Sequence, residues 1–285
     1  MLNNLSLYTT ISIWYNCHIL EIINMKKVVF MALIFDAHAH YDDDKFNEDR
    51  EELLASMPDR GVGYIVNAGV DIETSKWALE YSEKYDFIYS AVGVHPESAD
   101  NLPKDYISQL ESLAKHKKAV AIGEIGLDYY WDNVPRDVQK RVFIEQLNLA
   151  RNMNLPVVIH DRDAHGDTMD ILREYKPNGL LHCFSGSVEM CKEIVKLGMS
   201  ISLGGVVTFK NARQSVEVAE YIPLDRLLLE TDAPYLTPVP FRGKRCDSSM
   251  IKFTAMRIAE IKGISMEELI NITTENACRL YNIEK

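Results

Sequence analysis

The chain has 285 residues, of which 47% are hydrophobic and 26% charged, which is enough for one large domain or two modest ones with a sizeable core. The formal net charge of −11 at pH 7 argues against broad nucleic-acid binding through a basic surface, although a metal site or a local basic rim would escape this argument. No apolar run reaches the ~20 residues of a membrane-spanning helix, and five cysteines without a CxxC motif favour a reducing, cytoplasmic location.

Residues 1–30 differ from the rest of the chain. They show no clear periodicity and lack the basic start and small-residue cleavage site of a secretory signal. Met25 and Met31 both stand just before the first convincing strand. We therefore expect residues 1–30 to be an N-terminal extension that is disordered or precedes the true start, with a targeting or partner-binding arm as the alternative. Residues 31–285 are expected to form one domain.

From residue 32 on, short apolar runs alternate with longer amphipathic segments. The apolar runs predict eight strands, at Leu33–Ala37, Tyr64–Ala68, Ile88–Val92, Val120–Glu124, Pro156–His160, Leu180–Cys183, Met199–Leu203 and Leu227–Glu230. The amphipathic segments predict helices at Asn47–Ser56, Ile72–Tyr85, Asp105–Lys115, Arg136–Met153, Asp167–Tyr175, Val188–Leu197, Ala212–Tyr221, Ser248–Ile261 and Ser265–Tyr281. A capping box at Ser265–Glu268 marks the start of the last helix.

This alternation predicts an α/β fold with a parallel sheet and helices outside it. Eight strands are the number that a closed (β/α)₈ TIM barrel needs, and a doubly wound open sheet is the rival. The chain has no GxGxxG motif, no P-loop and no linker rich in Pro, Gly or Ser. The polar residues of interest follow the strands, at the end where barrel active sites form. We therefore favour a single barrel of the metal-dependent hydrolase type.

Metal-binding side chains gather at these strand ends. His38 and His40 are two residues apart on the first strand, so they should face the same side, and Glu124 ends an apolar run in which a lone carboxylate would be costly. The other candidates are His160, His182 and Asp232, after the fifth, sixth and eighth strands. This set can bind two divalent ions, with Glu124 as the bridging carboxylate. Imidazole and oxygen ligands without a thiolate favour Zn²⁺, Mn²⁺ or Mg²⁺.

Six motifs resemble the TatD family of metal-dependent deoxyribonucleases, and the likeness extends from about residue 33 to the end. They are His38-Ala-His40, Gly93-Val-His-Pro96, Gly123-Glu-Ile-Gly-Leu-Asp128, Ile159-His-Asp-Arg-Asp-Ala164, His182-Cys-Phe-Ser-Gly-Ser187 and Glu230-Thr-Asp-Ala-Pro-Tyr235. The resemblance implies an amidohydrolase-type barrel, two divalent ions and hydrolysis of DNA phosphodiester bonds. It also carries the ligand role onto the six candidate residues.

The expected catalytic residues are Glu124, Asp232 as proton acceptor, and His95. One expectation for His95 is contact with the phosphate or with the leaving oxygen. The alternative is that His95 orients a metal ligand without touching the metal or the substrate. Substrate contacts are expected from Arg162, Arg242 and Lys244 within a basic rim that also includes Lys210, Arg213 and Arg245. Ser185 and Ser187 precede a helix and are expected to help seat a phosphate.

An acidic body with a small basic rim favours a few nucleotides at a strand end over wrapped duplex. We therefore expect a 3′–5′ exonuclease acting on single strands or strand ends, without an obligate protein partner. Two alternatives remain: a metallohydrolase for a small molecule or an aminoacyl-tRNA ester, and a non-catalytic metal-binding scaffold. One motif departs from the family pattern, since Cys246-Asp247-Ser248 stands where the family commonly has Asn-Glu-Pro. The contacts of this loop are therefore open.

Overall fold

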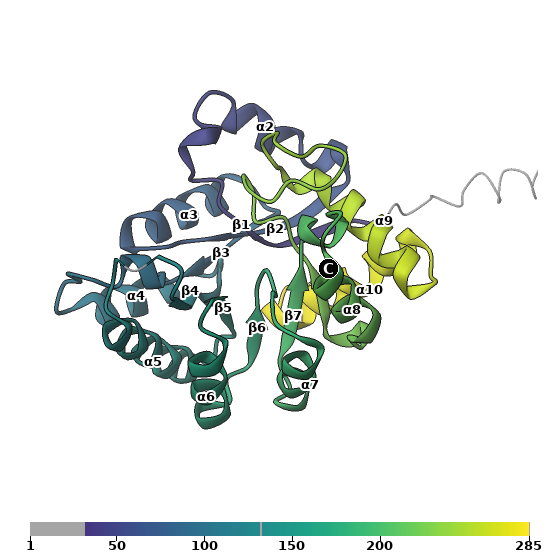
Figure 1. Cartoon of the computed structure of the whole chain (residues 1–285). Helices are drawn as coiled ribbons and strands as arrows, with labels where there is room; N and C mark the ends of the chain where they lie inside the picture. Colours follow the sequence, from purple (N-terminus) through teal and green to yellow (C-terminus); the bar gives the residue numbers. More distant parts are fainter. Residues whose placement is uncertain (1–31, 132, 285) are drawn as a thin grey trace, which may run out of the picture. The chain divides into compact units, whose positions relative to one another are not determined.

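The computed structural model describes residues 32–131 and 133–284, and these form an eight-stranded parallel barrel surrounded by helices (Figure 1). The predictions for residues 1–30 lie outside the described residues. The strands are β1 (Ile34–Ala39), β2 (Val62–Ala68), β3 (Ile88–Val92), β4 (Ala119–Asp128), β5 (Val157–Arg162), β6 (Gly179–Leu181), β7 (Ser200–Leu203) and β8 (Leu227–Leu229). They pair in chain order from β1 to β8.

The two edge strands meet just beyond their carboxyl ends. Ala39 and Ala233 form a parallel bridge, and the backbone N–H of His40 donates to the Ala233 carbonyl at 2.7 Å. The N–H of Asp232 donates to the carbonyl of His38 at 3.0 Å. The unbroken strand order excludes a doubly wound sheet, because that topology needs a reversal of strand order. The predicted (β/α)₈ barrel is therefore confirmed.

Helices follow the strands along the chain and cover the outside of the barrel. They are α2 (Arg50–Ser56), α3 (Ile72–Lys84), α4 (Tyr106–Ala114), α5 (Arg136–Met153), α6 (His165–Tyr175), α7 (Val188–Lys196), α8 (Arg213–Tyr221), α9 (Ile251–Lys262) and α10 (Met266–Tyr281). The Ser265 hydroxyl accepts from the N–H of Glu268 at 3.1 Å, so Ser265 caps α10 as predicted.

Several predicted boundaries were wrong by a few residues. Strand β4 continues past Glu124 to Asp128, and Gly126 makes this possible. Gly126 has φ +145°, and a Cβ atom there would lie 2.0 Å from the carbonyl oxygen of His160, its partner on β5. The predicted helix Ser248–Ile261 begins as a 3₁₀ turn at Ser248–Met250 before α9. Helix α2 begins at Arg50, after a 3₁₀ turn at Asp44–Phe46.

The core has two parts. The larger part lies between strands and helices, and the smaller part fills the barrel interior. The end of α10 belongs to this smaller part: Tyr281 stacks on Phe35, near the start of β1, and its hydroxyl donates to the Ala37 carbonyl at 2.9 Å. Helix α10 therefore closes the barrel at the start of the strands, and the cavity lies at the other end.

Two further features bear on predictions from composition. Within the described ranges, no helix has the length and hydropathy needed to cross a membrane. Cys183, Cys191 and Cys246 are free thiols, and burial raises the pKa of each thiol above its ordinary value. These three cysteines are therefore neither disulfide partners nor activated nucleophiles.

Candidate metal centre

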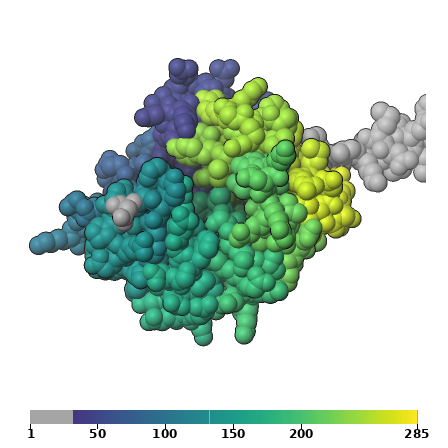
Figure 2. Space-filling view, viewed as in Figure 1, coloured from purple at the N-terminus to yellow at the C-terminus, as the bar shows by residue number. Residues whose placement is uncertain are grey.

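All six predicted ligands meet at the carboxyl end of the barrel. They lie in or next to a cavity of about 320 Å³ whose walls include Glu124, His160 and Asp232. Figure 2 shows this side of the molecule hollowed between the teal segment, which contains β4 and β5, and the yellow-green segment that follows β8. Parallel strands bring their carboxyl ends to one rim, so residues almost 200 positions apart become neighbours.

Glu124 lies at the centre of the cluster, and its two carboxylate oxygens face different partners. Oε2 lies 3.2 Å from Nε2 of His38 and 3.3 Å from Nε2 of His40. Oε1 lies 2.8 Å from Nδ1 of His160 and 2.8 Å from Nε2 of His182. One carboxylate thus joins two pairs of imidazoles, which is the arrangement expected of a bridging ligand.

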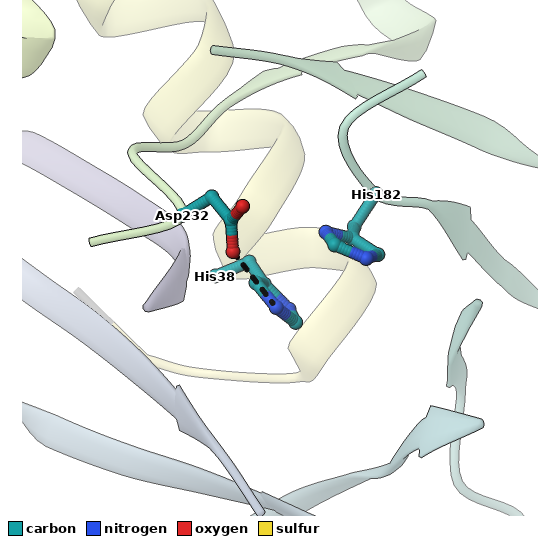
Figure 3. Close-up of side chains that lie close together, drawn as sticks. All are labelled: His38, His182 and Asp232. Atoms are coloured by element: carbon teal, nitrogen blue, oxygen red, sulfur yellow. Dashed lines mark ion pairs between the residues drawn. The ribbon is translucent and has the colours of Figure 1, made fainter. Parts of the chain in front are cut away.

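Asp232 completes the group around Oε2. Its Oδ1 lies 3.5 Å from Nε2 of His40 and 3.9 Å from Nε2 of His38. In Figure 3, the side chains of Asp232 and His182 lie on either side of the His38 ring, and the His38 and His182 rings stack at 3.9 Å. Asp232 follows β8 in a left-handed conformation with φ +57°, which aspartate tolerates better than most residues.

The hydrogen bonds on the far side of two rings fix which nitrogen carries the proton. His40 Nδ1 faces the carbonyl oxygen of Ala68 at 3.1 Å, and a carbonyl can only accept. His160 Nε2 faces Oδ2 of Asp128 at 3.0 Å, which likewise accepts. A neutral ring at either position would therefore carry its proton on the outer nitrogen, and its inner nitrogen, which faces Glu124, would be free to bind a cation.

This arrangement fits metal ions. The Nε2 atoms of His38 and His40 are 2.9 Å apart and both face the Oε2 oxygen of Glu124, so lone pairs converge where a cation would satisfy them together. Four groups of at least three metal-binding side chains occur among the described residues, and two of them share Glu124. The donors could hold one cation between His38, His40, Glu124 and Asp232, and a second between Glu124, His160 and His182.

His95 differs from these ligands in which ring nitrogen carries the proton. Its Nε2 lies 3.4 Å from Oε1 of Glu124, and its ring contacts His160 edge-on with centroids 4.4 Å apart. However, its Nδ1 accepts the backbone N–H of Glu97 at 3.2 Å, so the neutral ring carries its proton on Nε2. The cavity therefore receives a hydrogen-bond donor from His95, in contrast to the lone pairs of His40 and His160.

The electrostatic balance of the cavity is acidic. Burial alone would raise the pKa of Glu124, but His182, His95 and His38 around it hold that pKa well below its usual range. Further carboxylates line the walls, from Asp42, Asp43, Glu97 and Asp128. Arg162 is the single lysine or arginine in the part of this lining that the structure describes. An anionic substrate would meet mostly negative charge here without bound cations.

Of the predicted substrate contacts, the structure places only Arg162 in the cavity wall. Ser187 caps α7 by accepting from the N–H of Met190 at 3.3 Å, so its hydroxyl is already engaged, and Ser185 also lies outside the lining. Arg242 stacks on Phe209 with its guanidinium carbon 3.8 Å from the ring centroid. Lys244 lies near Phe241. Arg242 and Lys244 are therefore outside the lining of this cavity.

Sequence reasoning assigned no role to Asp128 and Asp36. Asp128 contacts His160, as described above. Asp36 is fully buried on β1 and accepts from the N–H of Thr231 at 2.9 Å and from the hydroxyl of Ser248 at 2.6 Å. It therefore connects β1, which carries His38, to the loop that carries Asp232. Its position two residues before the HxH pair was the available signal.

The same network answers the question left by the unusual motif. Cys246, Asp247 and Ser248 are all buried. Besides contacting Asp36, the Ser248 hydroxyl lies 2.8 Å from the hydroxyl of Tyr41, which also accepts the backbone N–H of Ser248 at 3.0 Å. A proline at this position could make neither the hydroxyl contact nor the N–H contact. This chain therefore anchors its loop through Ser248.

Comparisons with known proteins agree with this architecture. The family model described as TatD related DNase matches residues 35–282. The chain belongs to the TatD family. It is 47% identical over 254 residues to the uncharacterised metal-dependent hydrolase YabD of Bacillus subtilis, covering 88% of this chain and 100% of YabD. It is 38% identical to the uncharacterised metal-dependent hydrolase YcfH of Escherichia coli K12, covering 88% and 96% of the two chains.

A solved structure supports the same assignment. The crystal structure of the TatD homologue YjjV from Escherichia coli K12 superposes with a TM-score of 0.83 at 30% identity, covering 89% of this chain and 99% of YjjV. The TatD family protein of Entamoeba histolytica gives a TM-score of 0.79 at 26% identity, covering 89% and 100%. The chain is therefore a metal-dependent hydrolase of the TatD family, with its candidate ligands in the cavity described above.

Proposed function

We propose that this TatD-family protein hydrolyses DNA phosphodiester bonds at strand ends as a two-metal 3′–5′ exonuclease. The observation that carries the proposal is the position of Glu124. Its two oxygens face separate groups of ligands, Oε2 toward His38 and His40 and Oε1 toward His160 and His182. A pair of divalent ions is the usual means by which enzymes displace a phosphate ester by water.

The candidate ligands form two groups, one for each of two divalent ions. His38, His40 and Asp232 would hold one cation, His160 and His182 would hold the other, and Glu124 would contribute one oxygen to each. When bound, such ions lower the pKa of a water molecule and offset the charge of the phosphoryl oxygens. Asp128 keeps His160 in the orientation that ligation requires, because the carboxylate accepts the proton on Nε2.

Asp232 and His95 are the side chains proposed to accept and donate protons. Asp232 borders the cavity with a carboxylate that can accept a proton from the attacking water. His95 presents a protonated Nε2 to the same cavity, and from there it can donate to the phosphate or to the leaving oxygen. The acceptor and the donor thus come from different strand ends, Asp232 after β8 and His95 after β3.

The charge of the cavity favours a small substrate footprint. Its carboxylates would repel a long polyanion, so binding depends on the cations and on Arg162. A terminal phosphodiester satisfies that requirement, whereas a duplex laid across the acidic surface would not. The free thiols of Cys183, Cys191 and Cys246 favour a reducing compartment such as the cytoplasm.

The test uses metal-free protein supplied in turn with Mg²⁺, Mn²⁺ or Zn²⁺. Single-stranded and double-stranded DNA, labelled at either end, would report cleavage, strand preference and polarity. We expect metal-dependent release of mononucleotides, starting from the 3′ end and faster on single strands. Hydrolysis of a lactone or an aminoacyl-tRNA ester without any cleavage of DNA would contradict the proposal. So would metal binding without hydrolysis of any of these substrates.

A further inference from the structure

An exposed aromatic pair stands beside the cavity. Tyr130 and Trp131 lie two and three residues after the end of β4, and 54% and 49% of their surfaces are exposed to solvent. Their rings meet edge to face with centroids 4.9 Å apart. Two consecutive large aromatic side chains that are half exposed bury little apolar surface and so add little to the stability of the core. An exposed apolar patch surrounded by polar groups is typical of a binding site.

The pair is fixed relative to the metal centre through Asp128. Oδ1 of Asp128 accepts the backbone N–H of Tyr130 at 2.9 Å and that of Trp131 at 3.1 Å. Oδ2 of the same carboxylate lies 3.0 Å from Nε2 of His160. A single side chain therefore sets the distance between the aromatic pair and a candidate metal ligand, as a subsite next to a reacting bond requires.

Arg162 connects the pair to the cavity. Its guanidinium carbon lies 3.9 Å from the centroid of the Tyr130 ring and 5.7 Å from that of the Trp131 ring. Arg162 also lines the cavity. Among the described residues it forms no close ion pair, and the carboxylate of Glu97, which also lines the cavity, lies within electrostatic range of it. A planar cation is thus held against an aromatic face and remains available to a phosphate.

We propose that Tyr130 and Trp131 form a stacking subsite for one unpaired nucleobase at a strand end, while Arg162 binds the adjoining phosphate. This inference rests on the proposed function, because it names the substrate class of the same site. A base inside a duplex has both faces covered by its neighbours, so only an unpaired, splayed base can present a face to these rings. Every base has such a face, so the subsite selects single-stranded ends without selecting a sequence.

The test compares two internally labelled single strands of the same length. One carries natural nucleotides throughout, and the other has abasic residues at both ends, which keep the phosphates and remove the bases. Stacking is worth roughly a 10–100-fold change in affinity per base. We therefore expect the wild-type protein to have a kcat/KM higher by about that factor on the natural strand, with most of the difference in KM.

Variants separate stacking from phosphate binding. The double variant Tyr130→Ala/Trp131→Ala should lose the preference for the natural strand, so that it cuts both strands with a similar kcat/KM. Trp131→Phe, which keeps a ring, should retain most of the preference. Arg162→Gln should slow both strands by the same factor, because both keep their phosphates. Melting temperature and metal content are measured on each variant, so that a folding defect is recognised.

Tyr221 provides a matched control. It is 39% exposed and has a cationic partner, Lys192, whose Nζ lies 5.3 Å from the ring centroid. It ends α8, just before β8, and therefore lies at the opposite end of the barrel. Tyr221→Ala should behave as the wild type on both strands. The wild type cutting both strands equally, or the double variant keeping the preference, would overturn the stacking subsite alone. A wild type that cuts neither strand would overturn the proposed function as well.

Discussion

Asp128 and His160 form a carboxylate–imidazole pair in which Oδ2 lies 3.0 Å from Nε2, and the other ring nitrogen of His160 faces Glu124 at 2.8 Å. Because the carboxylate accepts the proton on Nε2, it leaves Nδ1 free to bind a cation. The same ring could otherwise take either tautomer or rotate. Asp128 is thus a positioning residue for one side of the proposed metal centre.

The first prediction follows from this pair. Asp128→Asn should weaken the binding of one of two divalent ions by ~10–100-fold, because an amide holds the imidazole proton less well than a carboxylate. Titration of metal-free protein by calorimetry would measure the loss. Asp161→Asn is the control, because Asp161 makes a similar contact with His165 at 2.7 Å, away from the cavity lining. Equal metal affinity in wild type and Asp128→Asn would refute the positioning role.

A second prediction concerns His95. Its proton lies on Nε2, so we expect it to act on substrate, and His95→Ala should leave both ions bound. Turnover should fall by ~10²–10⁴-fold, the usual cost of losing a positioned acid. Metal affinity and turnover should be measured on the same sample. If metal affinity falls instead and excess metal restores the rate, then His95 orients a ligand and does not touch the substrate.

The third prediction compares two buried serines. Ser248 donates to Asp36 at 2.6 Å, whereas the hydroxyl of Ser90, which is equally buried, has no hydrogen-bond partner among the described residues. Ser248→Ala should lower the free energy of unfolding by ~1–3 kcal/mol, because Asp36 and Tyr41 lose a buried partner. Ser90→Ala should be neutral or stabilising, since it removes an unsatisfied polar group. Chemical denaturation measures both, and equal effects would count against the network.

Much of the fold follows from local patterns in the sequence. Alternating apolar runs and amphipathic segments predict the eight strands, because a barrel strand buries both faces and a surface helix buries one. The site follows from the same alternation, since residues at the carboxyl ends of parallel strands must meet at one rim. His38, Glu124, His160 and Asp232 could therefore be grouped without coordinates.

Other features depend on the orientation of side chains, which the spacing of residues in the sequence does not specify. Asp128 turns one oxygen to the backbone of Tyr130 and the other to His160, and no local pattern reveals this division. The contact between Asp36 and Ser248 joins residues 212 positions apart. Ser187 precedes a helix, as expected of a phosphate-binding residue, but its hydroxyl caps α7. In each case the outcome depends on a specific hydrogen bond that the sequence pattern does not show.

A fourth prediction tests the N-terminal boundary. All eight strands and every candidate ligand lie within residues 34–232, and the described residues begin at Ala32. Deleting residues 1–30 should therefore leave the melting temperature and the rate of DNA cleavage unchanged. Differential scanning calorimetry and the strand-end assay would check both quantities. A large drop in either would show that residues 1–30 contribute to the core or to the site.

The central claim is that Glu124 bridges two ions, and counting the ions bound per chain tests it most directly. Elemental analysis of saturated protein should give two divalent ions per chain in the wild type. Glu124→Gln should bind clearly fewer than two and lose DNA cleavage by several orders of magnitude, because both positions lose a charged ligand. Glu97→Gln, which removes a carboxylate from the same cavity wall, should keep both ions. Two tightly bound ions and a near-normal rate in Glu124→Gln would contradict the account.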